Sequence, residues 1–222
     1  MPQLLSKTDI AIEWTDLAKW SQTLQPKSAH VRSPGVHISG IIRAIQQKIG
    51  KLQPDDITDE MPLRMAVGMA WENWVIGLEQ AQTEWKIEWQ PGEWECDGIF
   101  GTPDGIGEVT RYTAEIQKGG GIKKGQQTYR CLDEFKATWK SEFNRKDIAA
   151  ESLWMWQLAA SCYVLGLEYA RLHVLWVNGD YRPPQPKYFV YLLKFERGDL
   201  DRFWRDTVMV NRGIAVAETG QR

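Results

Sequence analysis

The stretch LDEFKATWK, residues 132–140, decides how this sequence is read. Its apolar residues suit a buried strand, yet Glu134 and Lys136 lie among them with opposite charges. Because side chains alternate between the two faces of a strand, Glu134 and Lys136 share one face while Asp133 and Phe135 share the other, more core-like face. Taken alone, the stretch is better explained by an ion pair on a solvated face than by a chemical site, since such pairs are common.

Apolar periodicity and turn residues place further elements around this stretch. We expect a first helix from Ser39, as its cap, to Gly50 and a second over 63–81, followed by strands within 84–118 and a flexible basic loop at 117–127. After the quoted stretch, we expect a long helix over 148–165 closed by Gly166. Two strands around the Asn178-Gly179 turn signal and a closing helix over 200–210 complete the chain. This order predicts an α/β (mixed α+β) fold with a central mixed β-sheet flanked by helices. We expect one domain over residues 1–222, in which 1–60 are a helical lead-in to a core of 61–222.

The composition excludes several classes of protein. The formal charge of −2 gives no overall nucleic-acid signal, so such contacts would need a local patch. The three cysteines, Cys96, Cys131 and Cys162, form no CxxC pair and cannot make a four-thiolate metal site. With no signal peptide and no membrane span, the sequence predicts a cytoplasmic protein. Twelve tryptophans fill a core and leave room for a subunit interface, so self-association stays open.

Three other polar residues invite a chemical reading, and each also has a simpler one. Asp104 lies in GTPDG, which is ordinary turn chemistry. Glu72 follows Gly68 by four residues, so the two share one face of an amphipathic helix. Gln157 lies inside an apolar helix, where a primary amide must find hydrogen-bond partners or cost free energy.

The order of these features along the chain resembles the PD-(D/E)xK nuclease superfamily, and within it the RecB-like and phage exonuclease branch. The resemblance spans about residues 64–195, and the matching residues are Gly68, Glu72, Pro103, Asp104, Glu134, Lys136 and Gln157. The chain departs from the RecB-type pattern at Ser161, where that pattern usually has a tyrosine.

The resemblance implies a restriction-endonuclease-like core that hydrolyses DNA to products with a 5′-phosphate. It implies Mg²⁺, with Mn²⁺ able to substitute, because carboxylate oxygens suit hard cations and the transition state gathers negative charge. In this reading Lys136 orients the attacking water and Gln157 anchors the site. The expected catalytic residues are Glu72, Asp104, Glu134, Lys136 and Gln157, and the expected metal ligands are Glu72, Asp104, Glu134 and the carbonyl oxygen of Phe135.

A basic segment is expected to flank this site. Residues 111–146 contain nine Lys or Arg and four Asp or Glu, a local charge of +5 in a chain of −2. Phosphate contacts would require such an excess, although a solvated basic loop explains any single lysine as well. The expected nucleic-acid-binding residues are Lys118, Lys123, Lys124, Arg130 and Lys140.

Three functions remain open at this stage. The first is a Mg²⁺-dependent phage-type DNA exonuclease of recombination or replication, acting beside a single-strand annealing or recombination protein. The second is a DNA-binding recombination accessory protein that does not cut, against which the intact acidic residues and lysine argue. The third is a structure-specific or restriction-type endonuclease on the same site, which the sequence does not separate from the first.

Overall fold

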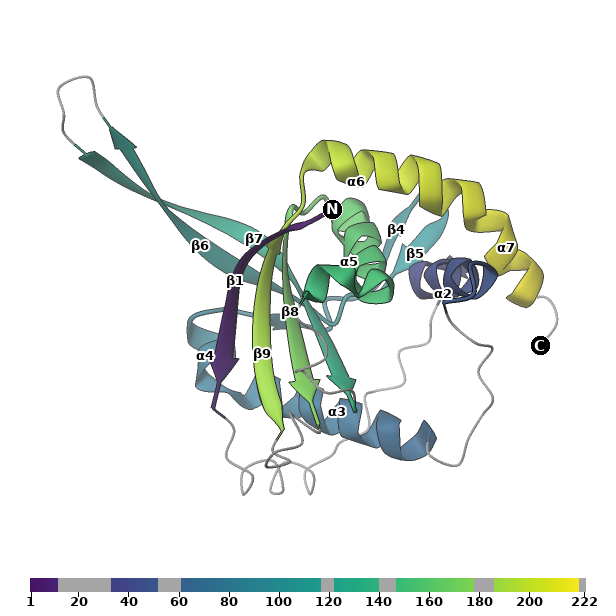
Figure 1. Ribbon diagram of the computed structural model, residues 1–222, viewed down its shortest axis with the longest axis horizontal. Helices are drawn as coiled ribbons and strands as arrows, with labels where there is room; N and C mark the ends of the chain where they lie inside the picture. Colours follow the sequence, from purple (N-terminus) through teal and green to yellow (C-terminus); the bar gives the residue numbers. More distant parts are fainter. Residues whose placement is uncertain (12–32, 52–60, 117–121, 140–146, 178–185, 220–222) are drawn as a thin grey trace.

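The structure is a computed structural model of the chain, and it describes residues 1–11, 33–51, 61–116, 122–139, 147–177 and 186–219 (Figure 1). Within these residues, no helix is both long and apolar enough to cross a membrane. The single-domain organisation stays a prediction.

A six-stranded sheet holds the quoted stretch near its middle (Figure 1). Its strands are β1 Gln3–Ile10, β3 Glu88–Trp89, β6 Gly105–Ile116, β7 Ile122–Thr138, β8 Tyr169–Trp176 and β9 Lys187–Lys194. They lie in the order β1-β9-β8-β7-β6-β3, and all neighbours pair antiparallel except β7 and β8, which are parallel. A parallel pair needs a crossover connection, and the helix α5, Ser152–Leu165, lies in it. The predicted strand at 132–138 is confirmed as the last part of β7.

Helices cover both faces of this sheet. Their bounds are α2 Ile38–Lys48, α3 Met61–Gly77, α4 Glu79–Thr83, α5 Ser152–Leu165, α6 Arg197–Phe203 and α7 Val210–Thr219, with a 3₁₀ turn at Ile148–Ala150 and a π-helical stretch at Trp204–Met209. Leu158 of α5 packs with Leu132 of β7 on one face. Trp71 of α3 packs with Phe135 of β7 on the opposite face. The predicted fold, a mixed sheet flanked by helices, is therefore confirmed.

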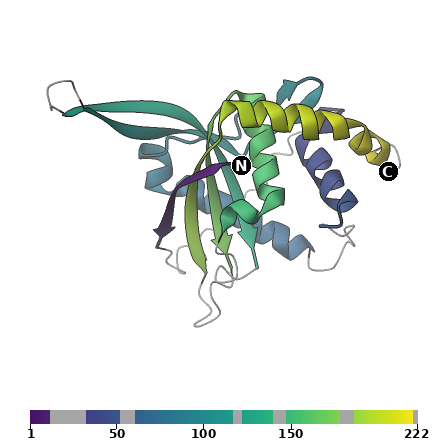
Figure 2. The same ribbon diagram turned by 45° about the horizontal axis from the view of Figure 1, so that its top comes forward.

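A second apolar cluster extends the α5 side of the molecule. Ile41 of α2, Ala160 of α5 and Trp204 meet there, and Figure 2 shows α6 and α7 running across α5 with α2 beside them. A small sheet of β2 Val36–His37, β5 Ile99–Gly101 and β4 Trp94–Cys96 borders this cluster. Its β2 leads directly into α2, so the first turn of α2 lies beside β5.

Several expected elements differ from those observed. The helical lead-in at 1–60 is wrong at its start, because Gln3–Ile10 pairs with β9 as an edge strand of the main sheet. Ser39 lies inside α2 and does not cap it; His37 occupies the cap position. The flexible loop at 117–127 is wrong from Ile122 onward, where β7 already pairs with β6.

Other boundaries are close to expectation. The long helix starts at Ser152, after the 3₁₀ turn, and it ends at Gly166, whose φ of 67° gives the expected left-handed cap. The closing helical segment is longer than predicted, from Arg197 to Thr219. The Asn178-Gly179 turn signal lies outside the described residues.

Candidate active site

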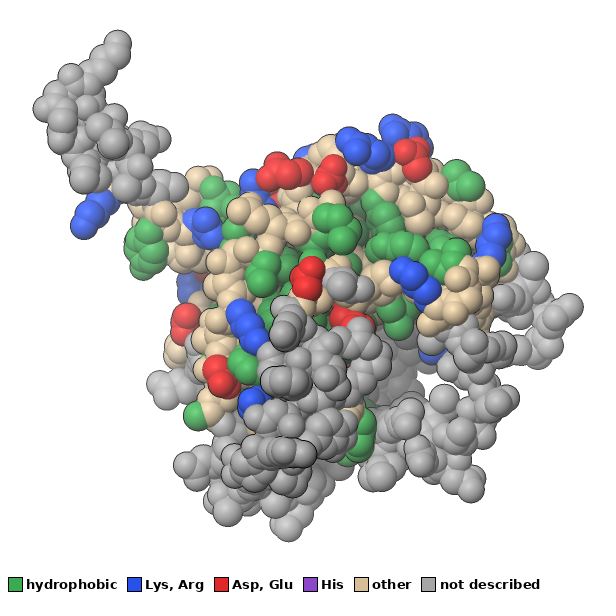
Figure 3. Space-filling view, viewed as in Figure 1, with side chains coloured by type: hydrophobic (Ala, Val, Ile, Leu, Met, Phe, Trp, Pro, Cys, Tyr) green, Lys and Arg blue, Asp and Glu red, His purple; other side chains and the backbone are tan. Residues whose placement is uncertain are grey.

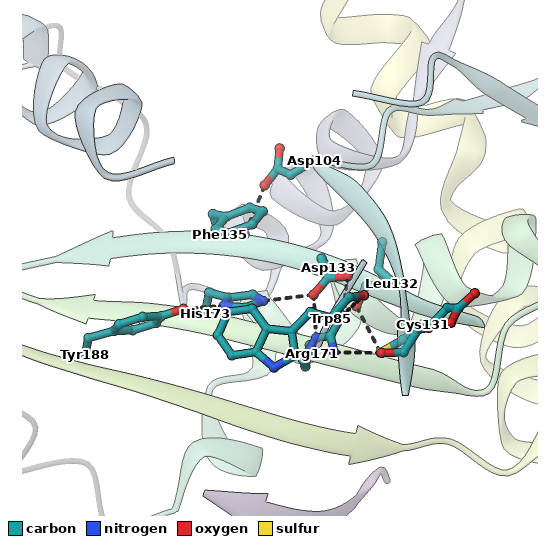
Figure 4. Close-up of polar contacts among 10 residues, drawn as sticks. Trp85, Asp104, Cys131, Leu132, Asp133, Phe135, Arg171, His173 and Tyr188 are labelled. Carbon is teal, nitrogen blue, oxygen red and sulfur yellow. Dashed lines mark hydrogen bonds and ion pairs between the residues drawn. The ribbon is translucent and has the colours of Figure 1, made fainter. Parts of the chain in front are cut away.

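The candidate site lies at the end of the pairing between β6 and β7, where β6 begins and β7 extends beyond it. The last pair between these strands joins Gly105 to Asp133, so the five residues from 134 to 138 pair with β8 alone in the described sheet. At this open edge the amide of Phe135 donates a 3.0 Å hydrogen bond to Oδ2 of Asp104 (Figure 4). The aspartate of the turn is thereby tied to the strand that carries Glu134.

All five side chains expected to be catalytic line one cavity of about 160 Å³. They come from three separated parts of the fold: helix α3, the turn before β6 together with β7, and helix α5. The cavity is lined by Glu72, Asp104, Glu134, Lys136 and Gln157, together with His37, Ile38, Ser39, Phe100, Gly101, Thr102, Phe135 and Ser161.

Glu134 is the best-connected of these acids. Its side chain is only 4% exposed, and its Oε1 accepts a 2.5 Å hydrogen bond from Nζ of Lys136, which is 21% exposed. The same oxygen accepts a 2.8 Å hydrogen bond from Nε2 of Gln157. The carboxylate is therefore held between an ammonium on its own strand and an amide on α5.

The electrostatics of the cavity combine burial with neighbouring negative charges. Burial raises the pKa of Glu134 to about 7, with a further rise from the nearby Asp104 and a smaller one from Glu72, while Lys136 opposes them. Burial alone would lower the pKa of Lys136, but the charges of Glu134 and Asp104 outweigh it and raise that pKa. Lys136 thus stays charged near neutral pH, whereas Glu134 is close to its midpoint there.

Part of the lining was not expected from the sequence. The first turn of α2 borders the cavity through Ile38 and Ser39, and the free amides of a helix N-terminus favour negative charge. His37 also borders it, but its ring nitrogens contact the carbonyl oxygen of Ser33 at 3.0 Å and a carboxylate oxygen of Glu93 at 3.5 Å. No sequence motif marks these residues, because they reach the cavity only through the packing of α2.

Gly68, the other residue of the helical motif, is not held by close packing. A Cβ built there would meet no atom within 4 Å. The glycine therefore leaves open space one turn before Glu72, as its position on the same helix face predicts.

The cavity has the donor chemistry of a divalent-cation site. Three carboxylates border it, and the pKa of Glu134, raised first by burial and then by the charge of Asp104, is one that a bound cation would lower. Within the described residues, however, no three acidic, histidine or cysteine side chains are gathered closely enough to form a ready-made metal site. The carboxylates present are ligands of the type that a divalent cation prefers, and their side chains would have to move closer together to bind one.

The opposite face of the same strand carries a second polar group with no opening to the cavity. Asp133 is fully buried and accepts hydrogen bonds from Nε and Nη2 of Arg171 at 2.6 and 2.9 Å (Figure 4). Its Oδ1 also lies 2.8 Å from Nε2 of His173, whose Nδ1 lies 2.7 Å from the hydroxyl of Tyr188. The prediction that Asp133 faces away from Glu134 is therefore confirmed.

The basic residues expected to flank the site are spread along β7. Lys123 and Lys124 lie near the far end of this strand, and the twelve residue steps from Lys124 to Lys136 span about 40 Å. Lys124 does not border the cavity, contrary to expectation. Arg130 is exposed, about 20 Å along the strand from Lys136. Lys118 and Lys140 lie outside the described residues.

No protein-family model matches this sequence, and a search of curated proteins finds no match either. Among solved structures, the alkaline exonuclease LHK-Exo of Laribacter hongkongensis, in complex with dAMP, is 13% identical with a TM-score of 0.47. That match covers 83% of this chain and 87% of the exonuclease. A phage-related exonuclease from Haemophilus somnus 129PT is 10% identical with a TM-score of 0.46, and the match covers 96% and 97% of the two chains. Identities this low bear on the fold alone.

Proposed function

We propose that this protein is a nuclease that hydrolyses phosphodiester bonds in DNA with the help of a divalent cation, preferably Mg²⁺. The observation that carries the proposal is the convergence of Glu72, Asp104, Glu134, Lys136 and Gln157 on one cavity from distant parts of the chain. An isolated ion pair on a solvated strand face would not need two more carboxylates and a partly buried amide around it. We further propose exonuclease action of the phage type, with 5′-phosphate products.

The residues of the cavity have separate tasks in this reaction. Lys136 is charged and hydrogen-bonded, so its ammonium can donate to the attacking water and to a phosphoryl oxygen as negative charge builds there. Gln157 holds the carboxylate of Glu134 in place. Water attacks the phosphorus, the bond from phosphorus to the 3′ oxygen breaks, and the leaving oxygen takes up a proton.

Glu72, Asp104, Glu134 and the carbonyl oxygen of Phe135 would hold the cation. When bound, the cation neutralises charge on the phosphoryl oxygens and on the leaving oxygen. The first turn of α2 supports the same proposal, because its amides favour an anionic group at the cavity.

The test is a digestion series with the full chain and linear, nicked, closed-circular and single-stranded DNA, and RNA, in Mg²⁺, Mn²⁺ or EDTA. We expect linear DNA to be degraded with either cation, and no degradation in EDTA. Lys136→Ala and Glu134→Gln should each abolish cleavage. The matched control is Lys86→Ala, which removes a lysine of an exposed strand-edge ion pair with Glu108 and should cut normally.

The other outcomes are equally informative. Cutting of closed-circular DNA would replace exonuclease with endonuclease action. DNA binding by the wild-type chain without any cleavage would favour the non-cleaving accessory role. Full activity of Lys136→Ala would refute the proposed site.

A further inference from the structure

A two-stranded arm leaves the body of the molecule where β8 ends its pairing with β7. Residues 108–116 of β6 and 122–130 of β7, hereafter the arm, pair with each other, while β8 reaches only to Cys131 and β3 only to Ile106. Figures 1 and 2 show the arm projecting from the sheet without a neighbouring element. Its register is continuous from Glu108↔Arg130 to Ile116↔Ile122.

The arm does not have the composition of a ribbon that packs on a protein core. A two-stranded ribbon is marginally stable alone in water, and it usually gains stability by burying an apolar face. Of the side chains described in the arm, at 108–112 and 124–130, Val109 is buried at the base and Tyr112 is 79% exposed farther out. Most of the others are polar and exposed, as Gln126, Gln127 and Thr128 are.

The exposed face of the arm continues the face of β7 that carries the candidate site. Alternation places every second residue of β7 on the same side, allowing for the twist of the strand, and no register shift interrupts the pairing. This face carries Lys124, Gln126, Thr128 and Arg130 on the arm, then Leu132, which is buried with α5, and then Glu134 and Lys136 at the cavity. The cationic and hydrogen-bonding side chains on the arm, hereafter the track, therefore share a strand face with the cavity and are separated from it by the buried Leu132.

The charge of this track is not balanced locally. Among the described residues, the side chains of Lys124 and Arg130 make no hydrogen bond or ion pair, and both are exposed. Beyond Glu108 at the base, which pairs with Lys86, no described side chain of the arm is acidic. Lys and Arg side chains (blue) lie along the described part of the arm in Figure 3.

We infer that the arm is a docking surface for a nucleic-acid duplex, whose phosphate backbone it contacts through Lys124 and Arg130 at a distance from the cavity. This inference rests on the proposed function, because the duplex is the one whose end enters the cavity. A duplex is stiff over about 150 base pairs, so one whose end enters the cavity and that runs toward the arm stays straight over this distance, whereas a single strand need not. A second copy of the arm would bring like charges together, and the described side chains of the arm form no continuous apolar face to bury.

The span of the track sets a length requirement. The twelve residue steps of strand from Lys124 to Lys136 cover about 40 Å, which is about 12 base pairs. Contacts to Lys124 are thus available only to duplexes longer than this.

The test compares Lys124→Gln/Arg130→Gln in the full chain with Arg111→Gln, which removes an arginine from the opposite face of the arm. Binding is measured by fluorescence anisotropy in EDTA with blunt duplexes of about 8 and 30 base pairs. We expect the double variant to bind the longer duplex about tenfold more weakly, with a salt slope lower by about 2, one unit per lost phosphate contact. The shorter duplex should lose much less affinity, and Arg111→Gln should bind both duplexes as the wild-type chain does.

Wild-type affinity of the double variant for the longer duplex would overturn the inference. So would an equal loss with Arg111→Gln, since charge alone would then suffice, or a change of oligomeric state in sedimentation without a change in DNA affinity. Cleavage with Mg²⁺ is measured in parallel, so the two proposals can fail separately. A wild-type chain that binds through the arm but never cuts refutes only the proposed function, and one that cuts but ignores the arm substitutions refutes only this inference.

Discussion

Gln157 and Lys136 hold the same oxygen of Glu134 from two different elements. The amide of Gln157 donates to Oε1 at 2.8 Å from α5, and the ammonium of Lys136 donates to it from β7 itself. This pairing explains why a primary amide lies inside an almost wholly apolar helix, since its hydrogen bond is made at the cavity. It also sets the position of the carboxylate before any ligand arrives.

Gln157→Leu should therefore damage catalysis more than folding. Without the amide, Glu134 keeps only Lys136 as a described hydrogen-bond donor to Oε1, so its orientation loosens. We expect kcat to fall about 10- to 100-fold, as for other residues that orient a ligand, with stability changed by about 1 kcal/mol or less. Gln47→Leu on α2, outside the cavity, is the control. Unchanged kcat in Gln157→Leu would contradict the positioning role.

The pKa of Glu134 predicts an unusual dependence of stability on pH. Because the folded-state pKa of about 7 lies above the ordinary value of 4.5, the folded protein binds more protons than the unfolded chain between these pH values. The free energy of unfolding contributed by this group is then retained below about pH 4.5 and declines as pH rises to about 7. We expect a decline on the order of 1–3 kcal/mol in urea titrations without divalent cations, and a flatter profile in Glu134→Gln. If the free energy of unfolding changed with pH in the same way in the wild-type chain and in Glu134→Gln, the raised pKa of Glu134 would be contradicted.

Addition of Mg²⁺ should restore that stability at alkaline pH. A cation that binds only the folded protein stabilises it by about 2.7 kcal/mol at a hundredfold excess over its dissociation constant. We expect Tm to rise with Mg²⁺ at pH 8 in the wild-type chain and not in Asp104→Asn. Asp206→Asn, which removes an exposed carboxylate paired with Arg205, should respond as the wild-type chain does. An identical response of all three proteins would place the cation elsewhere.

The sequence predicted the strand of the site well because alternation acts over neighbouring residues. Glu134 and Lys136 on one face and Asp133 on the other follow directly from the pleat, and the structure has them so. The gathering of Glu72 and Gln157 around that strand depends on which helix covers which face. Periodicity within a helix does not show which face of the sheet the helix covers. The order of the motifs along the chain indicated this gathering only because it resembles that of a known superfamily.

The wrong sequence predictions have a common physical origin, which is strand pairing between segments distant in the sequence. Gln3–Ile10 is a strand because β9 offers it an open edge, and nothing local in QLLSKTDI requires that state. The glycine- and lysine-rich stretch at 117–127 reads as a loop, yet from Ile122 it continues β7 against β6. From the sequence, this basic segment is expected to flank the site, whereas Lys124 lies about 40 Å from Lys136 along the strand.

The buried pair of Asp133 and Arg171 should matter for stability far more than an exposed pair. Burial alone would raise the pKa of Asp133, but the charge of Arg171 and the hydrogen bonds from His173 and Arg171 hold it below its ordinary value. Arg171→Met leaves this carboxylate buried with only His173, so we expect the free energy of unfolding to fall by about 3–5 kcal/mol in urea denaturation. Lys86→Met, which breaks the exposed pair with Glu108, should cost less than about 1 kcal/mol. In Asp133→Leu/Arg171→Met the loss should be smaller than the sum of the two single losses, because neither charge is left alone. Additive losses would mean that the two side chains act independently, despite the two hydrogen bonds that join them.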